Sequence, residues 1–328
     1  MYKTGLVLGK FAPLHRGHQL LIETGLKQSK RLVVLIYDSP SVTNVPLSVR
    51  SRWISDLYPE AEVILGWASP EDVGYTDEIK HLNEQYVAKV LRNRKINAIF
   101  SGEPYGEHMS LFLKAKDIRV GKDEFKTCAT AIREDTTGKK DFLHPRVYRD
   151  LITNVVILGG VSTGKTTLTE ALAKEYNTLW QPEYGREYWD KYQVDRKLSF
   201  VELETIMLMH VAREEDKIYK ANQYLFVDTN AITTECFAYY YHGHTTYDLK
   251  TKTRIFAKRY DVTFVCGVNI PYEDTEDRSG EISREVLQSM TLDYLRSNKI
   301  PFHMLTASSL EGRIAEVKDV LNKIGVKR

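Results

Sequence analysis

The sequence has little of several features that mark other protein classes. Its three cysteines, Cys128, Cys236 and Cys266, are scattered without CxxC spacing, which argues against a disulfide framework or a zinc site. Its 46 Lys and Arg residues nearly balance 44 Asp and Glu residues, so no broad basic surface for nucleic acid is expected. Apolar runs such as 32–37 fall far short of the about 20 residues that span a bilayer. No secretory signal is visible. We therefore expect a cytoplasmic protein without membrane insertion.

Short apolar runs alternate with amphipathic stretches along the whole chain of 328 residues, which is long enough for two domains. In the first half, strands are expected at 5–8, 32–37, 61–65 and 98–100, and helices at 17–29, 46–57 and 76–93. A polar, turn-like stretch follows at 134–140. In the second half, strands are expected at 154–158, 224–227, 262–266 and 302–305, and helices at 167–176, 200–223 and 312–324. This alternation predicts an α/β protein with two parallel-sheet domains, which we place at 1–148 and 149–328.

The first strand-to-helix junction carries two histidines. The segment 9–18 reads GKFAPLHRGH, and a helix is expected from about residue 17. A helix N-terminus offers free N–H groups and partial positive charge to a phosphate. We therefore expect His15 and His18 to stabilise charge that develops at the α-phosphate of ATP. Two surface histidines at a helix start are the alternative. The further ATP contacts expected from this motif are Gly9, Lys10, Phe11 and Gly17.

This segment resembles the nucleotidyltransferase signature GxFxPxHxGHxxLI, which it matches at every fixed position. The stretch KTCATAIR at 126–133 resembles the second ATP motif of the same enzymes, ISxTxIR, with cysteine where serine is usual. Here Thr130 is expected to cap a helix that faces phosphate, and Arg133 to clamp the β- and γ-phosphates. Asp38 ends the second strand, where polar side chains line ligand crevices, so we expect it to contact substrate. Trp53 suits either that crevice or the core.

A second phosphate motif opens the second half of the chain. The segment 159–166 reads GGVSTGKT and satisfies GxxxxGK[ST], with a strand expected before it and a helix after it. The glycine-rich turn lets successive N–H groups point inward as an anion site. Lys165 is expected to reach the β- and γ-phosphates, and the Thr166 hydroxyl to bind Mg²⁺. The remaining ATP contacts expected here are Gly159, Gly160, Ser162, Thr163, Gly164 and Thr167.

A carboxylate should accompany such a loop at the end of another strand. Asp228, in VDTN, is expected to hold Mg²⁺ together with Thr166, and a helix N-cap is its alternative role. The segment 181–188 reads QPEYGREY and follows a stretch that is expected to form the second strand of this half. Its Glu183 and Arg186 suit the hydroxyls of a sugar acceptor or a surface pair. Four neighbouring aromatic side chains suit stacking on a flat cationic ring: Trp180, Tyr184, Tyr188 and Trp189. The sequence leaves open which of them stacks, and we choose Trp180 and Tyr184 as substrate contacts.

The stretch 271–284 contains two arginines among acidic and small residues. That composition suits a lid in which Arg278 reaches the transferring phosphate, and a solvated charged loop is the alternative. By analogy of fold, the small residues at 306–309 lie where kinases of this size contact adenine.

The order of motifs resembles one bacterial family. A GKFAPLHRGH segment followed by GGVSTGKTT, EYGRE and VDTN is similar to the bifunctional nicotinamide-nucleotide adenylyltransferase/ribosylnicotinamide kinase family, the NadR type. The resemblance covers essentially the whole chain. It implies a Rossmann-like adenylyltransferase domain followed by a P-loop kinase domain. It also implies phosphorylation of nicotinamide riboside by ATP to nicotinamide mononucleotide, and adenylylation of that product by ATP to NAD and pyrophosphate.

Some members of this family carry an N-terminal helix-turn-helix domain and act as repressors. The first expected strand here begins within a few residues of Met1, so we expect neither that domain nor direct repression. Two other functions stay open: a sensor of NAD status, with a functional link to a riboside transporter, and a nucleotidyltransferase–kinase fusion that acts on another metabolite. The sequence also leaves open whether the chain forms a homo-oligomer.

Overall fold

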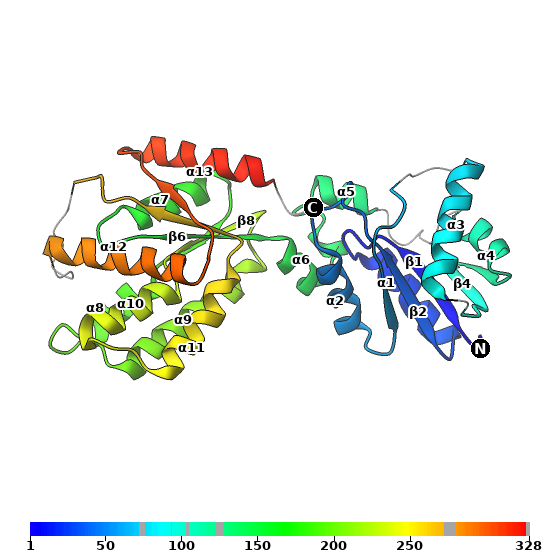
Figure 1. The fold of residues 1–328 in the computed structure, drawn as a ribbon, viewed down its shortest axis with the longest axis horizontal. Helices are drawn as coiled ribbons and strands as arrows, with labels where there is room; N and C mark the ends of the chain where they lie inside the picture. Colours follow the sequence, from blue (N-terminus) through cyan, green and yellow to red (C-terminus); the bar gives the residue numbers. More distant parts are fainter. Residues whose placement is uncertain (72–75, 93, 103–104, 122–127, 272–279, 326–328) are drawn as a thin grey trace. The chain divides into compact units, whose positions relative to one another are not determined.

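The structure is a computed structural model that describes residues 1–71, 76–92, 94–102, 105–121, 128–271 and 280–325. The chain divides between Leu151 and Ile152 into two compact units, each with its own sheet and core. Both sheets have five strands, and every strand pairing in them is parallel. The predicted α/β class with two parallel sheets is confirmed (Figure 1).

The first unit is a doubly wound sheet in the order β3-β2-β1-β4-β5. The order in which strands are added reverses between β1 and β4, and such folds bind their ligands at this point. Its elements are β1 Gly5–Gly9, α1 Arg16–Gln28, β2 Leu32–Tyr37, α2 Leu47–Leu57, β3 Glu62–Gly66, α3 Asp77–Leu91, β4 Ala98–Ser101, α4 Tyr105–Phe112, β5 Lys116–Arg119, α5 Ala129–Glu134, the 3₁₀ turn η1 Lys140–Phe142 and α6 Pro145–Leu151.

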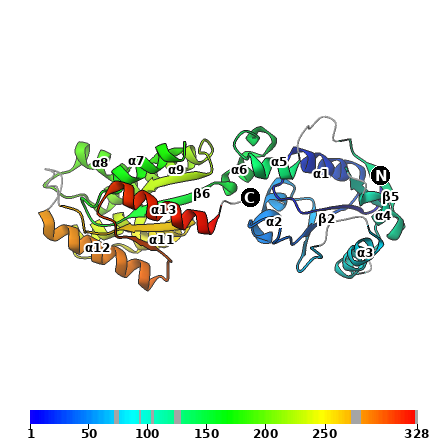
Figure 2. The same ribbon diagram turned by 90° about the horizontal axis from the view of Figure 1, so that it is seen from above.

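Helices cover both faces of this first sheet (Figure 2). Helices α1 and α2 contact the central strands on one face, while side chains of α3 and α4 share a core cluster with Leu6, Val33 and Ile99 on the other. Because both faces are covered, β2 is buried along its whole length, and its sequence LVVLIY is a continuous apolar run. After the polar stretch at 134–140, the chain forms the additional helix α6 before the second unit begins.

The second unit has the strand order β10-β9-β6-β8-β7, so the first strand of the unit lies at the centre. Its elements are β6 Thr153–Leu158, α7 Lys165–Glu175, β7 Leu179–Gln181, α8 Tyr184–Tyr192, α9 Phe200–Ile218, β8 Tyr224–Asp228, α10 Ala231–His242, α11 Tyr247–Phe256, the 3₁₀ turn η2 Ala257–Arg259, β9 Val262–Cys266, α12 Gly280–Ser297, β10 His303–Leu305 and α13 Leu310–Ile324.

Two cores flank this second sheet. Helices α7 and α13 pack on one face around Val155, Ile157 and Phe226, and a separate cluster joins α9, α10 and α11 on the other side (Figure 1). Helix α9 ends at Ile218, five residues earlier than expected, and Gln223 before β8 has a φ of 61°, which no helix accommodates. No described helix is both long enough and apolar enough to cross a bilayer.

Candidate functional site

In the first unit, His15 is the N-cap of α1. Its Nδ1 accepts the Gly17 N–H at 3.1 Å, and His18 Nδ1 accepts the His15 N–H at 3.5 Å, which completes a capping box. A neutral imidazole whose Nδ1 accepts carries its proton on Nε2. Both rings therefore carry an Nε2–H donor at the start of the helix, the arrangement that a phosphate oxygen requires.

Packing fixes the two rings in place. Their centroids lie 3.8 Å apart in a stacked arrangement, and the buried Phe11 ring meets His18 edge-on at 5.0 Å. A side chain at Gly17 would bring its Cβ within 3.0 Å of the His15 ring, so only glycine leaves this cap undisturbed. The predicted histidine pair is thus held rigidly at the carboxyl end of β1.

Two cations converge near these histidines. Burial lowers the pKa of Lys10, and the nearby Arg133 lowers it further. Burial also lowers the pKa of Arg133, whose guanidinium donates to the Ala12 carbonyl at 2.5 Å and to Thr130 Oγ1 at 3.0 Å. Two partly desolvated cations beside each other mark a place where an anion is favoured.

The expected capping role of Thr130 is wrong. Cys128 is the N-cap of α5, without a side-chain bond, and Thr130 lies in the first turn. Its hydroxyl accepts from Arg133 instead, so Thr130 orients the arginine.

The end of β2 is tied to the loop after β1 by a buried arginine. Arg50 is 1% exposed and donates to the Lys10 and Tyr37 carbonyls at 2.6 and 2.9 Å, while its Nη2 lies 3.8 Å from Asp38 Oδ1. Asp38 is half-buried at the carboxyl edge, where the sequence placed it. Trp53 is fully buried and donates to Asp150 at 2.9 Å, so it belongs to the core.

In the second unit, the loop 159–164 joins β6 to α7 as GxxxxGK[ST] predicts. Gly159 has a φ of 140°, and a Cβ there would meet the Cys266 carbonyl at 2.9 Å. Gly164, with a φ of 78°, is the N-cap of α7. Both positions exclude other residues, which explains the spacing of the two glycines.

Lys165 and Thr163 converge on one carbonyl of this loop. Lys165 is 6% exposed, and its Nζ donates to the Gly160 carbonyl at 2.8 Å, as does Thr163 Oγ1 at the same distance. A pocket opens above the loop, lined by Ser162, Thr166, Thr167, Ile270, Ser308 and Arg313 among others. Residues 162–167 of the predicted loop therefore share one pocket with Ser308 and Ser309 of the predicted 306–309 segment. Arg278 lies outside the described residues.

Asp228 ends β8 beside Ile157 of the central strand. Its Oδ2 accepts from Thr166 Oγ1 at 2.5 Å, while its buried Oδ1 meets no hydrogen-bond partner in the described chain. Burial and the nearby Glu183 together raise the pKa of Asp228 to about 6, and Lys165 opposes the shift.

Mg²⁺ prefers oxygen ligands, and it usually takes only one or two from the protein while water and substrate phosphate oxygens fill its other positions. A buried carboxylate oxygen without a hydrogen-bond partner, next to a hydroxyl, suits this ion. Asp228 and Thr166 thus fit the predicted ion. No group of three or more His, Cys, Asp or Glu side chains able to hold a metal occurs in the described ranges.

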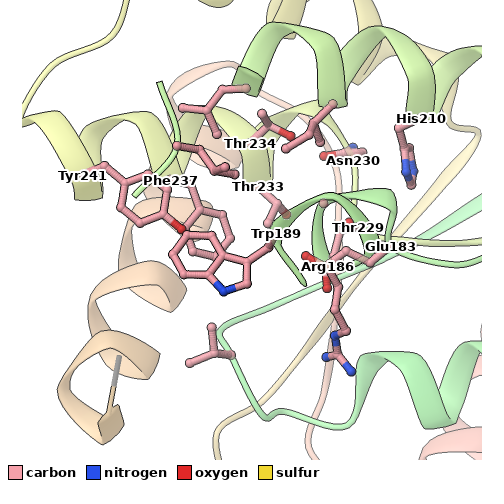
Figure 3. Close-up of a pocket in the computed structure, with 15 residues that line it drawn as sticks. Glu183, Arg186, Trp189, His210, Thr229, Asn230, Thr233, Thr234, Phe237 and Tyr241 are labelled. Atoms are coloured by element: carbon pink, nitrogen blue, oxygen red, sulfur yellow. The ribbon is translucent and has the colours of Figure 1, made fainter. Parts of the chain in front are cut away.

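A second, narrower pocket lies beside the phosphate loop (Figure 3). Glu183 and Arg186 from the start of α8 line it together with Trp189, and α10 supplies Thr233, Phe237 and Tyr241. The Trp189 and Tyr241 rings stack with centroids 5.7 Å apart, and Tyr241 stacks on Phe237. Arg186 lines both this pocket and the one above the phosphate loop.

The two aromatic residues chosen from the sequence lie elsewhere. Trp180 packs against the core cluster of the second sheet, on the side of Tyr176 and Phe226. One face of Tyr184 is covered by Arg213, whose Cζ lies 4.1 Å from the ring centroid. Trp189, Phe237 and Tyr241 line the pocket instead. Trp189 was one of the local aromatics noted in the sequence, but the two α10 residues carry no motif.

A buried ionisable cluster adjoins the pocket and also lacks a motif. His210 lines the pocket, and its Nε2 lies 3.3 Å from Glu214 Oε1 without hydrogen-bond geometry. Burial lowers the pKa of His210 to about 4 and raises that of Glu214 to about 7, although Tyr260 and Arg259 bond to the carboxylate. Their i, i+4 spacing on α9 is the only trace in the sequence.

Curated relatives match nearly the whole chain, and a family model matches most of its second half. A family model described as an AAA domain matches residues 154–313. The trifunctional NAD biosynthesis/regulator protein NadR of Salmonella typhimurium is 24% identical over 98% of this chain and 83% of its own length, and that of Escherichia coli is 25% identical with the same coverage. The resemblance to the NadR type is confirmed.

Two solved NadR structures share the fold. One, in complex with NAD and AMP-PNP, aligns with a TM-score of 0.60 and 21% identity. The other, in complex with NR, aligns with a TM-score of 0.59 and 22% identity. Both alignments cover 100% of this chain and 98% of the other, so the arrangement of a Rossmann-like unit followed by a P-loop unit extends to both proteins.

Proposed function

We propose that this chain is a bifunctional transferase of NAD salvage. Its second unit phosphorylates nicotinamide riboside with ATP, and its first unit joins the resulting mononucleotide to AMP from a second ATP, releasing pyrophosphate. The observation that carries the proposal is the place of Arg186, which lines both the pocket over the phosphate loop and the aromatic pocket. ATP in the pocket over the phosphate loop and an acceptor in the aromatic pocket would therefore meet at the Arg186 guanidinium.

The acceptor pocket suits a pyridinium riboside. Stacked aromatic rings favour a flat cation, and a carboxylate favours both positive charge and hydroxyl groups. Trp189 and Tyr241 supply the rings, and Glu183 supplies the carboxylate near the phosphate side of the pocket (Figure 3). The solved structure of a NadR protein in complex with NR supports this choice of substrate.

Phosphoryl transfer follows from the positions of five side chains. The riboside 5′-oxygen attacks the γ-phosphorus, the bond from that phosphorus to the bridging oxygen breaks, ADP leaves, and the hydroxyl proton passes to Glu183. Glu183 lines the acceptor pocket, whereas Asp228 accepts a hydrogen bond from Thr166. Glu183 therefore acts as the base and Asp228 as the metal ligand. Lys165 and Arg186 offset the charge of the transferring group. Mg²⁺, when bound by Asp228 and Thr166, neutralises phosphate charge.

Adenylyl transfer would use the histidine pair and the nearby cations of the first unit. A phosphate oxygen of the mononucleotide attacks the α-phosphorus, and the bond to the pyrophosphate group breaks. The Nε2–H groups of His15 and His18 donate to the α-phosphate oxygens as charge develops. Lys10 and Arg133 hold the departing β- and γ-phosphates, and Asp38 at the strand edge faces the incoming nucleotide.

The test separates the two reactions. The chain is incubated with nicotinamide riboside, ATP and Mg²⁺, and products are resolved by chromatography. We expect His18→Ala to abolish NAD formation while mononucleotide still forms. We expect Lys165→Ala to abolish riboside phosphorylation while supplied mononucleotide still becomes NAD.

Matched controls are available on the same units. His81→Ala changes an exposed histidine of α3, and Lys174→Ala changes an exposed lysine of α7, so both should retain both activities. Loss of both activities in either folded site variant would contradict the two-site assignment. Nucleotide binding without turnover by the unaltered chain would favour a sensor instead.

A further inference from the structure

One buried arginine joins three segments behind the phosphate loop. Arg313 lies in the first turns of α13 and is 3% exposed. Its Nη1 donates to the Thr163 carbonyl at 2.5 Å, its Nη2 to the Gly267 carbonyl at 3.0 Å and to Asn269 Oδ1 at 3.2 Å, and its Nε to the Ala307 carbonyl at 2.9 Å. The guanidinium thus connects the phosphate loop with the segments that follow β9 and β10.

The bond to Thr163 bears on how the loop binds anions. For the loop N–H groups to point toward phosphate, the carbonyls of the same peptides must point away. A buried carbonyl that points away from water needs a donor. The Gly160 carbonyl receives Thr163 Oγ1 and Lys165 Nζ, and the Thr163 carbonyl receives Arg313. The Thr163–Gly164 peptide is therefore held in the anion-binding orientation from outside the loop.

The charge of Arg313 also has no carboxylate counterpart among the described residues. All four acceptors are neutral, and no ion pair joins Arg313 to a carboxylate within the described parts of the chain. Burying a cation without a counter-charge costs free energy, so its presence needs a compensating anion. Arg313 lines the pocket over the phosphate loop, and its Nη1 would lie 3.4 Å from a Cβ placed on Gly164.

We propose that Arg313 is a positioning residue for the phosphate donor: it fixes the Thr163 peptide of the loop, and the nucleotide phosphates supply the counter-charge for its guanidinium. This inference rests on the kinase function proposed above. Because Arg313 also holds Ala307 within the expected adenine segment 306–309, α13 sets the phosphate and base ends of the donor pocket relative to each other.

The experiment measures both substrates of the kinase reaction in the full chain. Arg313→Met keeps an unbranched side chain about as long as the aliphatic part of arginine and removes the guanidinium with its donors and charge. We expect the KM for ATP to rise about 10- to 100-fold. A hydrogen bond from a charged group contributes about 1.5 to 3 kcal/mol, and each 1.4 kcal/mol changes an affinity about tenfold. The KM for riboside should stay within about twofold, and Arg313→Lys should lie between, because one ammonium reaches fewer of the four acceptors.

Two comparison variants isolate the effect. Arg296→Met removes an exposed arginine of α12 and should change neither constant. Glu316→Gln, one turn along α13, perturbs the carboxylate that accepts from the Thr306 and Ala307 N–H groups but does not touch the phosphate loop. It should raise the KM for ATP less than Arg313→Met does. Adenylyl transfer to supplied mononucleotide, measured in each preparation, reports whether the first unit is intact.

A purely structural role predicts a different result. If Arg313→Met lowered Tm without nucleotide and raised the KM of both substrates alike, or left the KM for ATP unchanged, the proposal would be overturned. The proposal predicts instead a smaller ATP-induced rise in Tm. If Arg313→Met does not fold, Arg313→Lys carries the same test. If the unaltered chain phosphorylates no riboside, the proposed function fails. The role of Arg313 is then tested by equilibrium binding of ATP. Only the part of the binding that Lys165→Ala removes is counted, because that part belongs to the phosphate loop.

Discussion

Thr166→Val is the most direct test of the phosphate site in the second unit. Valine has nearly the same shape as threonine, so the start of α7 should stay packed as it is. The variant removes one oxygen, the Oγ1 that donates to Asp228 Oδ2 at 2.5 Å. Asp228 is fully buried, and its other oxygen has no partner in the described chain, so the change leaves the carboxylate without any hydrogen bond there.

The magnitude follows from that geometry. A hydrogen bond to a charged acceptor contributes about 1.5 to 3 kcal/mol, equivalent to a rate effect of roughly 10- to 100-fold. The same hydroxyl is an expected Mg²⁺ ligand, which places the result toward the upper end. We therefore expect kcat/KM for riboside phosphorylation to fall about 100-fold in Thr166→Val. Thr166→Ser retains the hydroxyl and should stay within about threefold of the unaltered chain.

The assay compares both reactions in each preparation at saturating Mg²⁺. Adenylyl transfer to supplied mononucleotide should be unchanged, because its residues lie in the other unit. Asp228→Asn should reduce riboside phosphorylation as well, and the double variant should cost less than the sum, since both changes break one contact. Wild-type kinase activity in Thr166→Val, or full additivity with Asp228→Asn, would refute the assignment of the pair.

Two further predictions concern the aromatic pocket and the buried cluster beside it. Trp189→Ala should raise the KM for riboside about tenfold without changing that for ATP, whereas Trp180→Ala, which alters the core, should lower Tm and leave the riboside KM unchanged; steady-state kinetics and thermal unfolding distinguish them. The lowered pKa of His210, about 4, makes stability rise with pH between about 4 and 6.5, and the raised pKa of Glu214, about 7, makes it fall between about 4.5 and 7. The free energy of unfolding, measured in urea across this range, should therefore rise with pH more steeply in Glu214→Gln, which retains His210, and fall with pH in His210→Gln, which retains Glu214. Parallel pH profiles for the two variants would contradict the assignment.

Spacing in the sequence determined the two phosphate loops. His15 and His18 are three residues apart at a helix start, and this spacing alone lets each ring bond to the backbone of the same first turn. The glycines of GGVSTGKT occupy backbone conformations or contacts closed to other residues. Such local constraints act within one turn of chain, so a motif carries them. Alternation of apolar runs likewise predicted both parallel sheets, because strands covered on two faces are apolar throughout.

Capping was less predictable even at short range. Thr130 was expected to cap α5, yet the cap is Cys128, and the threonine instead bonds to Arg133. Threonine favours caps on average, but here its hydroxyl is engaged by Arg133. Here Arg133 also reaches the Ala12 carbonyl, a contact 121 residues away along the chain.

The acceptor pocket and the support of the phosphate loop were decided only by the tertiary structure. Trp180 and Trp189 are equal candidates in the sequence, but the short strand β7 turns Trp180 into the core while α8 turns Trp189 toward Tyr241. Strand direction and helix rotation depend on neighbouring elements, which no local pattern encodes. Arg313 lies 150 residues from Thr163, with which it shares a hydrogen bond. The sequence by itself determined the phosphate chemistry, because that chemistry needs a local backbone shape. The fold determined the acceptor pocket and the bracing of the loop, because both need side chains brought together from distant segments.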